Sequence, residues 1–180
     1  MLIFSACKKQ EETILSQEIS DWKFEYQGDW HQAEVPGNNF SDLLKHDFIP
    51  DPFYGTNEDS VQWVSEKNWI YRSNFTVSES TISKNNQTLN FYGLDTYAKV
   101  FLNDSLILEG DNMFRTWEVE VSDILKKENR LLIKFDAVSK IENGKQKTLG
   151  YHLPCKWWYK PFLCHHGVLL MGRNNYGSRF

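Results

Sequence analysis

The sequence predicts an antiparallel β-sandwich, and three observations lead to this fold class. Apolar residues alternate with polar ones in short runs, whereas an amphipathic helix would repeat them every three to four positions. Turn-forming pairs rich in Gly, Asn and Asp separate these runs. Aromatic residues make up 15% of the chain, including seven Trp, and such rings either fill a β core or present their faces to a ligand.

Each strand is predicted from residues that alternate toward one face of a sheet. The expected core-facing sets are Trp22/Phe24/Tyr26, Trp69/Tyr71/Ser73/Phe75/Val77, Leu89/Phe91, Ala98/Val100/Leu102, Trp117/Val119/Val121 and Leu131/Ile133/Phe135. Gly28-Asp29 is the expected turn after the first strand, and Asn103-Asp104 the expected hairpin turn before Ser105. Short strands with such regular turn signals are typical of a sandwich.

Little helix is expected between the strands. Residues 41–46 predict one short helix with Ser41 as its N-cap, and residues 57–64 predict a further helical turn. The polar run 78–87 is predicted to be a loop.

One loop stands out chemically: Asp51-Pro52-Phe53-Tyr54-Gly55-Thr56-Asn57-Glu58, followed by Val61-Gln62-Trp63. It is too rich in Pro, Gly and Asn for a regular element, and too aromatic for an ordinary solvated loop. Two interpretations remain open from the residues alone. Its rings either plug one end of the sandwich, or form a rim where aromatics beside amides and carboxylates face a sugar.

Length and charge set the outer limits on function. A chain of 180 residues suits one domain with a full core. The net charge of −4, with both signs interspersed, leaves no basic run for a nucleic acid, so we expect no nucleic-acid partner.

The N-terminus predicts export. Leu2-Ile3-Phe4-Ser5-Ala6-Cys7 precedes a polar stretch, as at the end of a bacterial lipoprotein signal peptide, and Cys7 would be the lipidated residue. The apolar part before Cys7 is shorter than the roughly 7–15 residues of a working signal core, so we expect the true start upstream. The protein is then expected in the periplasm or outer membrane of a bacterium, touching the membrane only through its lipid anchor.

Several further runs occur in a fixed order along the chain. They are Val35-Pro36-Gly37, Ser41-Asp42-Leu43-Leu44, Trp69-x-Tyr71, Gly93-Leu94-Asp95-Thr96-Tyr97-Ala98, Val100-x-Leu102-Asn103 and Asn112-Met113-Phe114-Arg115-x-Trp117. Together with the Asp51–Trp63 loop, this series resembles the N-terminal domain of β-mannosidases of glycoside hydrolase family 2. The resemblance covers about residues 22–147 and sharpens the expected fold to a galactose-binding-like jelly roll.

The resemblance implies a non-catalytic role. In that family both catalytic glutamates belong to a later TIM barrel, which follows an immunoglobulin-like domain, and the N-terminal domain packs against the barrel. The chain would therefore be inactive alone, and in the intact enzyme it would support hydrolysis of terminal β-mannosides. The residues expected to support the sugar pocket or the domain interface are Asp51, Tyr54, Asn57, Glu58, Trp63, Asp95 and Arg115.

The residues themselves agree with an inactive chain. Glycoside hydrolysis needs two carboxyl groups across one bond, and no pair here lies in an apolar setting that would raise a pKa. No phosphate-binding glycine loop is present, so no cofactor is expected.

The tail departs from the family pattern after Pro154. The expected Gly-Trp-Asp-Trp-Gly-Pro loop is absent, and Trp, Cys, His and Leu cluster without alternation. We therefore divide the chain into a signal remnant and linker (1–20), a jelly roll (21–154) and an aberrant tail (155–180) that a one-base frame slip would produce. A coding sequence in which no one-base shift restores the family motif would contradict this hypothesis.

A zinc site built from Cys155, Cys164, His165 and His166 is the competing interpretation of the tail. Adjacent histidines point oppositely in a strand and no Cys-x-x-Cys pair exists, so we expect no metal.

Two rival functions stay open beside the β-mannosidase domain. A free-standing carbohydrate-binding module would bind sugar as a soluble monomer. A non-functional truncated product would expose an apolar docking face and self-associate.

Overall fold

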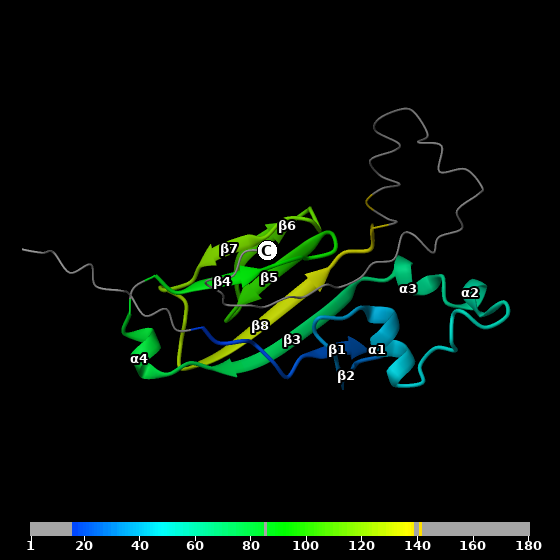
Figure 1. Ribbon diagram of the computed structural model, residues 1–180, viewed down its shortest axis with the longest axis horizontal. Coiled ribbons are helices and arrows are strands. Elements are labelled where there is room, and N and C mark those ends of the chain that lie inside the picture. The colour runs from blue at the N-terminus through cyan, green and yellow to red at the C-terminus, as the bar shows by residue number, and fades with distance from the viewer. Residues whose placement is uncertain (1–15, 85, 139–140, 142–180) are drawn as a thin grey trace, which may run out of the picture.

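The computed structural model describes residues 16–84, 86–138 and 141, which form two antiparallel sheets and several short helices (Figure 1). The strands are β1 Lys23–Tyr26, β2 Asp29–Gln32, β3 Trp69–Thr76, β4 Thr88–Phe91, β5 Ala98–Leu102, β6 Ser105–Gly110, β7 Trp117–Glu120 and β8 Glu128–Phe135. The helices are α1 Asn39–Lys45, α2 Asn57–Ser60, α3 Trp63–Glu66 and α4 Glu79–Ile82.

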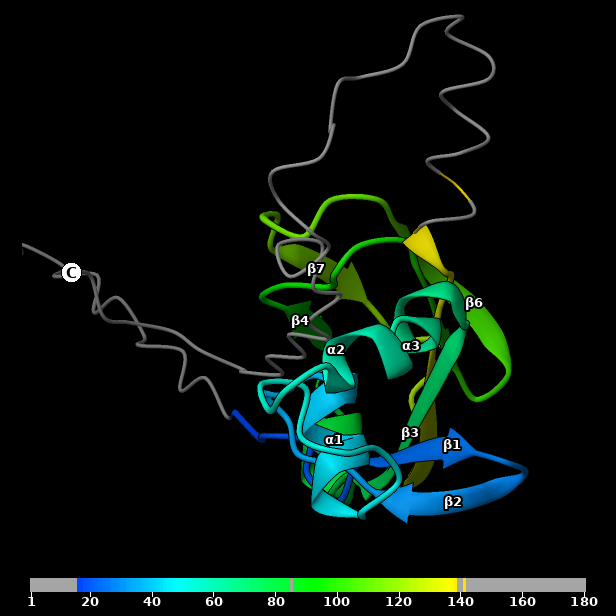
Figure 2. The same cartoon turned by 90° about the vertical axis from the view of Figure 1, so that its right-hand side faces the viewer.

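The larger sheet has the strand order β2-β1-β3-β8-β5-β6, and β4 pairs with β7 in the smaller one. The centre of the larger sheet is the long pair β3–β8, in register from Trp69 opposite Phe135 to Thr76 opposite Glu128. Figure 2 shows the β4–β7 pair and the helices α1 and α2 to the left of β3 and β6. The predicted class, an antiparallel β-sandwich with short helices, is confirmed.

Alternation places the core between the two sheets. Phe24, Tyr71, Val100 and Ile133 come from four neighbouring strands and are fully buried, as their period of two predicts. Each such side chain contributes roughly 1.5–3 kcal/mol by leaving water. Phe75, near the end of β3, is only half-buried.

The two predicted hairpins form, one of them with a shifted turn. Asn103 and Asp104 have φ values of 50° and 70°, as both central residues of a type I′ turn require. In the first hairpin Tyr26 pairs with Asp29, so the turn is Gln27-Gly28 and not Gly28-Asp29. Gly28 has φ of 90°, a backbone conformation that residues with a Cβ rarely adopt.

The helices differ from expectation at their ends. The predicted cap Ser41 is wrong: α1 begins at Asn39, and the Oδ1 of Asn38 accepts a hydrogen bond from the Ser41 backbone N–H at 2.9 Å. Residues 57–64 give two short helices, α2 and the start of α3. The predicted loop 78–87 contains α4, whose cap Ser78 accepts from the Thr81 N–H at 3.2 Å.

Candidate functional site

The loop from Asp51 to Asn57 is closed by its own polar groups. The Asp51 carboxylate accepts a hydrogen bond from the Phe53 N–H at 2.9 Å, and the Asn57 side-chain amide donates to the Asp51 carbonyl at 2.9 Å. Gly55 has φ of 61°, a conformation that a glycine adopts without strain. Asp51 and Asn57 therefore hold the loop in shape, which is a positioning role.

The two rings of this loop lie at the surface. Phe53 is 81% exposed and Tyr54 is 77% exposed, whereas the other aromatic side chains that the structure describes, apart from Phe114, are buried or half-buried. Of the two interpretations left open by the sequence, burial of these rings as a plug is wrong for Phe53 and Tyr54. Large exposed aromatics next to amide and carboxylate groups are suited to contact with a sugar or with another domain.

Trp63 anchors the segment that follows. Its ring stacks on Tyr26 with centroids 6.0 Å apart and lies 6.3 Å from Trp69. The Trp69 indole N–H donates to the Val64 carbonyl at 2.9 Å, so α3 is fixed to the end of β3. Trp63 is thus half-buried packing that supports the exposed loop.

Glu58 presents a buried carboxylate oxygen. Its Oε1 has no hydrogen-bond partner within the described ranges, although the side chain as a whole is only half-buried. An acceptor that is hidden from water in this way is costly unless a donor from elsewhere reaches it.

A second aromatic loop joins β6 to β7. The Asn112 side chain accepts from the Phe114 N–H at 2.9 Å, which repeats the Asp51–Phe53 arrangement, and Phe114 is 88% exposed. The Arg115 guanidinium lies 4.2 Å from the centre of the Trp117 ring. Arg115 is exposed and available to a ligand or a neighbouring domain.

Asp95 does not line an exposed site. It is buried beside the fully buried Leu94, and the Thr96 hydroxyl donates to its carboxylate. The hydrogen bonds that close the Asp51 loop do not involve Asp95. Of the predicted residues, the structure groups Asp51, Tyr54, Asn57, Glu58 and Trp63 in one segment, while Asp95 and Arg115 come from two others.

The candidate site residues predicted from the sequence do not include Phe53 and Phe114, the most exposed rings among the described residues. The signal was present in both cases: an Asx residue two positions before the aromatic closes a tight turn and turns the ring outward. Sequence reasoning also missed the buried pair Asp42 and Tyr71, because nothing in a single sequence shows that a helix carboxylate will meet a strand hydroxyl.

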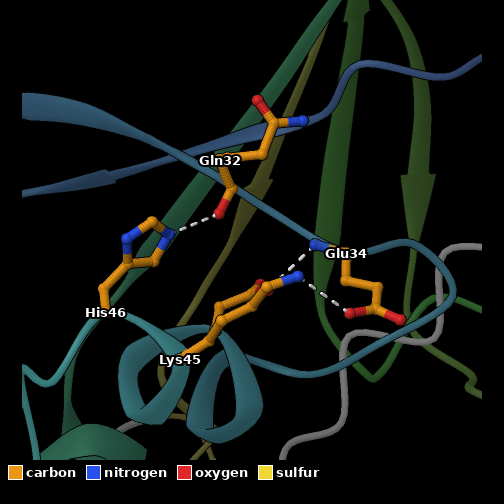
Figure 3. Close-up of polar contacts among 5 residues, drawn as sticks. Gln32, Glu34, Lys45 and His46 are labelled. Atoms are coloured by element: carbon orange, nitrogen blue, oxygen red, sulfur yellow. Dashed lines mark hydrogen bonds and ion pairs between the residues drawn. The ribbon is translucent and has the colours of Figure 1, made fainter.

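Helix α1 is attached to the strand-end segment 32–34 by several polar contacts (Figure 3). The His46 Nε2–H donates to the Gln32 carbonyl at 2.8 Å, and Lys45 pairs with Glu34 at 3.2 Å. Inside these, the Asp42 carboxylate accepts from the Glu34 N–H at 2.9 Å and from the Tyr71 hydroxyl at 3.0 Å. Since α1 precedes the Asp51 loop, these contacts set where that loop begins.

Burial is the main cause of the pKa shifts of Asp42 and Tyr71. It raises the pKa of the Asp42 carboxyl above its ordinary value, against the opposing effect of the Glu34 and Tyr71 hydrogen bonds. It also raises the pKa of Tyr71 well above 10, aided by the nearby Asp42 charge. Asp42 is almost inaccessible and has a tyrosine, not a second carboxyl, as its partner, so the pair is suited to fixing the fold.

The structure bears on the metal and anchor predictions only within its described residues. Among the described residues, no group of His, Cys, Asp and Glu is arranged to hold a metal ion. In the same ranges no helix has the length and hydropathy to cross a membrane. Cys7 and the tail from Cys155, with its frame-slip and zinc interpretations, lie outside the described residues.

Solved structures share this architecture. The β-D-mannosidase from Dictyoglomus thermophilum matches with a TM-score of 0.79 and 32% sequence identity, over 88% of this chain and 23% of that chain. The exo-chitosanase from Amycolatopsis orientalis matches with a TM-score of 0.59 and 17% identity, over 68% of this chain and 16% of that chain, which is a likeness of fold alone.

Curated relatives are similar over one part of their length. The chain is 46% identical over 106 residues to β-mannosidase B of Thermothelomyces thermophilus, covering 58% of this chain and 12% of that protein. It is 32% identical over 123 residues to the β-mannosidase of Rattus norvegicus, covering 68% of this chain and 14% of that protein.

Fold and loops together define a β-sandwich of the galactose-binding-like class, with exposed aromatic loops and a buried structural carboxyl. Residues 20–172 match the family described as glycosyl hydrolase 2 galactose-binding domain-like. The chain belongs to this family, and its described part corresponds to the N-terminal domain of β-mannosidases.

Proposed function

We propose that this chain acts as the non-catalytic N-terminal domain of a β-mannosidase that cleaves terminal β-mannosides. The observation that carries the proposal is the match to the Dictyoglomus thermophilum enzyme, at a TM-score of 0.79 and 32% identity over 88% of this chain. Because the match covers only 23% of that enzyme, the reaction is assigned to a separate catalytic barrel with two glutamates.

The domain's contribution is to support the barrel and to complete the rim of its sugar pocket. Phe53, Tyr54 and Phe114 are each more than three-quarters exposed, on loops closed by Asp51 and Asn112. Such rings lose little conformational freedom on contact, and they bury a large area against a sugar or a protein. The partner sugar is a β-mannoside or a manno-oligosaccharide.

Export is part of the same proposal. Cys7 follows small and apolar residues at the N-terminus, which supports a lipoprotein in the periplasm or outer membrane.

A domain exchange tests the proposal. Residues 21–154 of this chain, the jelly roll without the aberrant tail, replace the matching part of the Dictyoglomus thermophilum enzyme, and hydrolysis of p-nitrophenyl β-D-mannopyranoside is measured. The expected result is a folded chimera that hydrolyses the β-mannoside, while the isolated chain does not. A folded chimera with no activity would contradict the proposal.

A free-standing carbohydrate-binding module is the second candidate, favoured by the exposure of Phe53, Tyr54 and Phe114. Titration of the purified 180-residue chain with manno-oligosaccharides separates the two functions. Saturable binding by the monomer, together with an inactive chimera, would favour the module.

A further inference from the structure

The register of the larger sheet brings cations from four neighbouring strands onto one face. Lys23 of β1 lies directly opposite Arg72 of β3, and Lys99 of β5 lies directly opposite Lys134 of β8. Since β3 and β8 are adjacent, the four residues form a continuous group, here called the cation band. At about 4.8 Å per strand spacing, the band is roughly 14 Å across.

The band is on the outward face of the sheet. Its members alternate with Phe24, Tyr71, Ile133 and Val100, which are fully buried in the core. Lys99 and Lys134 are exposed, while Lys23 and Arg72 are half-buried. In Figure 2 the β4–β7 pair and α1 lie on the other side of this sheet.

Repulsion between the members of the band works against fold stability. Like charges directly opposite each other on a sheet are destabilising, and this occurs twice on one face of a chain whose net charge is −4. Lys99 has a carboxylate partner, Glu109, at 3.8 Å. Within the described ranges Lys23, Arg72 and Lys134 have none at ion-pair distance.

Aromatic rings hold two of the cations in place. The Arg72 guanidinium lies 3.8 Å from the centre of the Trp30 ring, and the Lys134 ammonium lies 5.2 Å from that of Phe101. Apolar Leu132 lies between these pairs, opposite both Arg72 and Phe101. The face therefore offers fixed positive charges beside an apolar strip.

We propose that the outward face of this sheet binds an anionic glycan, a polysaccharide bearing carboxylate or sulfate groups. Positive charges held on rings suit these anions, and the apolar strip suits the C–H face of a sugar ring. Glu25, opposite Trp30, and Glu109, opposite Lys99, carry negative charge at either side of the band. A duplex nucleic acid, with one charge per about 1.7 Å, would bring phosphates close to both carboxylates. A glycan with widely spaced carboxylates or sulfates can place its charges between them.

Binding of the full chain to polygalacturonate and to a lightly sulfated carrageenan, which lacks carboxylates, tests the site for carboxylates and sulfates separately. Galactomannan is the neutral control and double-stranded DNA the competing polyanion. The expected result is binding to at least one anionic glycan that weakens as salt rises from about 50 to about 200 mM, because salt screens interactions between exposed charges. The triple variant Lys23→Gln, Arg72→Gln, Lys134→Gln should bind at least about tenfold more weakly.

A charge-matched control removes three exposed lysines elsewhere: Lys84→Gln, Lys126→Gln, Lys127→Gln. It should bind like the parent, and Lys134→Gln alone should already weaken binding if the triple variant does not fold. If the chain bound neither of the two anionic glycans, the proposal would be overturned. Equal loss in the control variant would also overturn it, as would binding of DNA as tight as that of the glycans.

Discussion

The Tyr71 hydroxyl donates to the Oδ2 of Asp42 at 3.0 Å, and both side chains are almost completely excluded from solvent. The other Asp42 oxygen accepts from the Glu34 N–H at 2.9 Å. One buried carboxyl therefore joins α1, β3 and the segment after β2. Removing any partner leaves a buried polar atom without a hydrogen bond, and such an atom is costly.

Tyr71→Phe should lower the free energy of unfolding by about 1–3 kcal/mol, because Oδ2 of Asp42 then has no donor. Urea denaturation at neutral pH measures the change. Tyr54→Phe is the matched control, since that ring is 77% exposed and its hydroxyl is accessible to water. Equal effects of the two substitutions would contradict a special role for the buried pair.

Asp42→Asn should change how stability depends on pH. Because the folded state raises the pKa of Asp42, the stability this group contributes is full below its unfolded pKa, about 3.9, and is lost as pH rises through the folded value. The asparagine variant lacks this loss. Relative to the parent it should therefore gain stability as the pH rises from about 4 through the folded pKa of Asp42, measured by urea denaturation. A pH-independent difference between the two proteins would contradict the raised pKa.

Asn38→Ala should destabilise the protein by about 1 kcal/mol, because the N-cap of α1 is lost. Ser41→Ala keeps the capping acceptor and removes only the contact between its hydroxyl and the Asn38 side chain at 3.1 Å. Its effect should stay within about 0.5 kcal/mol. Thermal unfolding of both variants measures the two losses of stability. A larger loss in Ser41→Ala than in Asn38→Ala would identify Ser41 as the N-cap of α1.

The exposed and buried aromatics of the Asp51 segment should respond differently to truncation. Phe53→Ala with Tyr54→Ala should change stability by no more than about 0.5 kcal/mol, because both rings are in solvent. Trp63→Ala should cost roughly 2–3 kcal/mol, somewhat below the 3–5 kcal/mol of a fully buried Trp, because its ring packs on Tyr26. Denaturant titration that ranks the two changes in the opposite order would contradict these assigned roles.

Lipidation should depend on Cys7 if the N-terminus is a lipoprotein signal. Metabolic labelling with a radioactive fatty acid in a bacterial host, from the gene with its natural upstream sequence, should mark the parent and not Cys7→Ser. Ser5→Ala is the control and should remain labelled. Label that persists in Cys7→Ser would remove Cys7 as the lipid site.

The strands were predictable because burial of one face imposes a period of two, and Trp69, Tyr71 and Ile133 keep it. The hairpin at Asn103-Asp104 was predictable for a similar local reason, since its φ values suit that pair. Helix α4 was not predicted, because a four-residue helix carries too few positions for a periodic pattern. The cap of α1 was misplaced since Asn38 and Ser41 are both good caps, and only the path of the preceding chain selects one.

The candidate site was predictable where it is local and not where it depends on register. The Asp51 loop shows its turn chemistry in eight consecutive residues. The pairing of Asp42 with Tyr71 joins positions 29 residues apart, and the cation band joins four strands. Such neighbours are fixed by strand order and register, which local pattern does not encode.

The most direct test of the central claim combines the domain exchange with the exposed rings. The chimera carrying residues 21–154 is compared with the same chimera bearing Phe53→Ala and Tyr54→Ala, by kcat/KM on p-nitrophenyl β-D-mannopyranoside and by thermal unfolding. An active chimera, whose double variant unfolds at an unchanged temperature but loses at least about tenfold in kcat/KM, is the predicted result. A folded chimera without β-mannosidase activity would contradict the account.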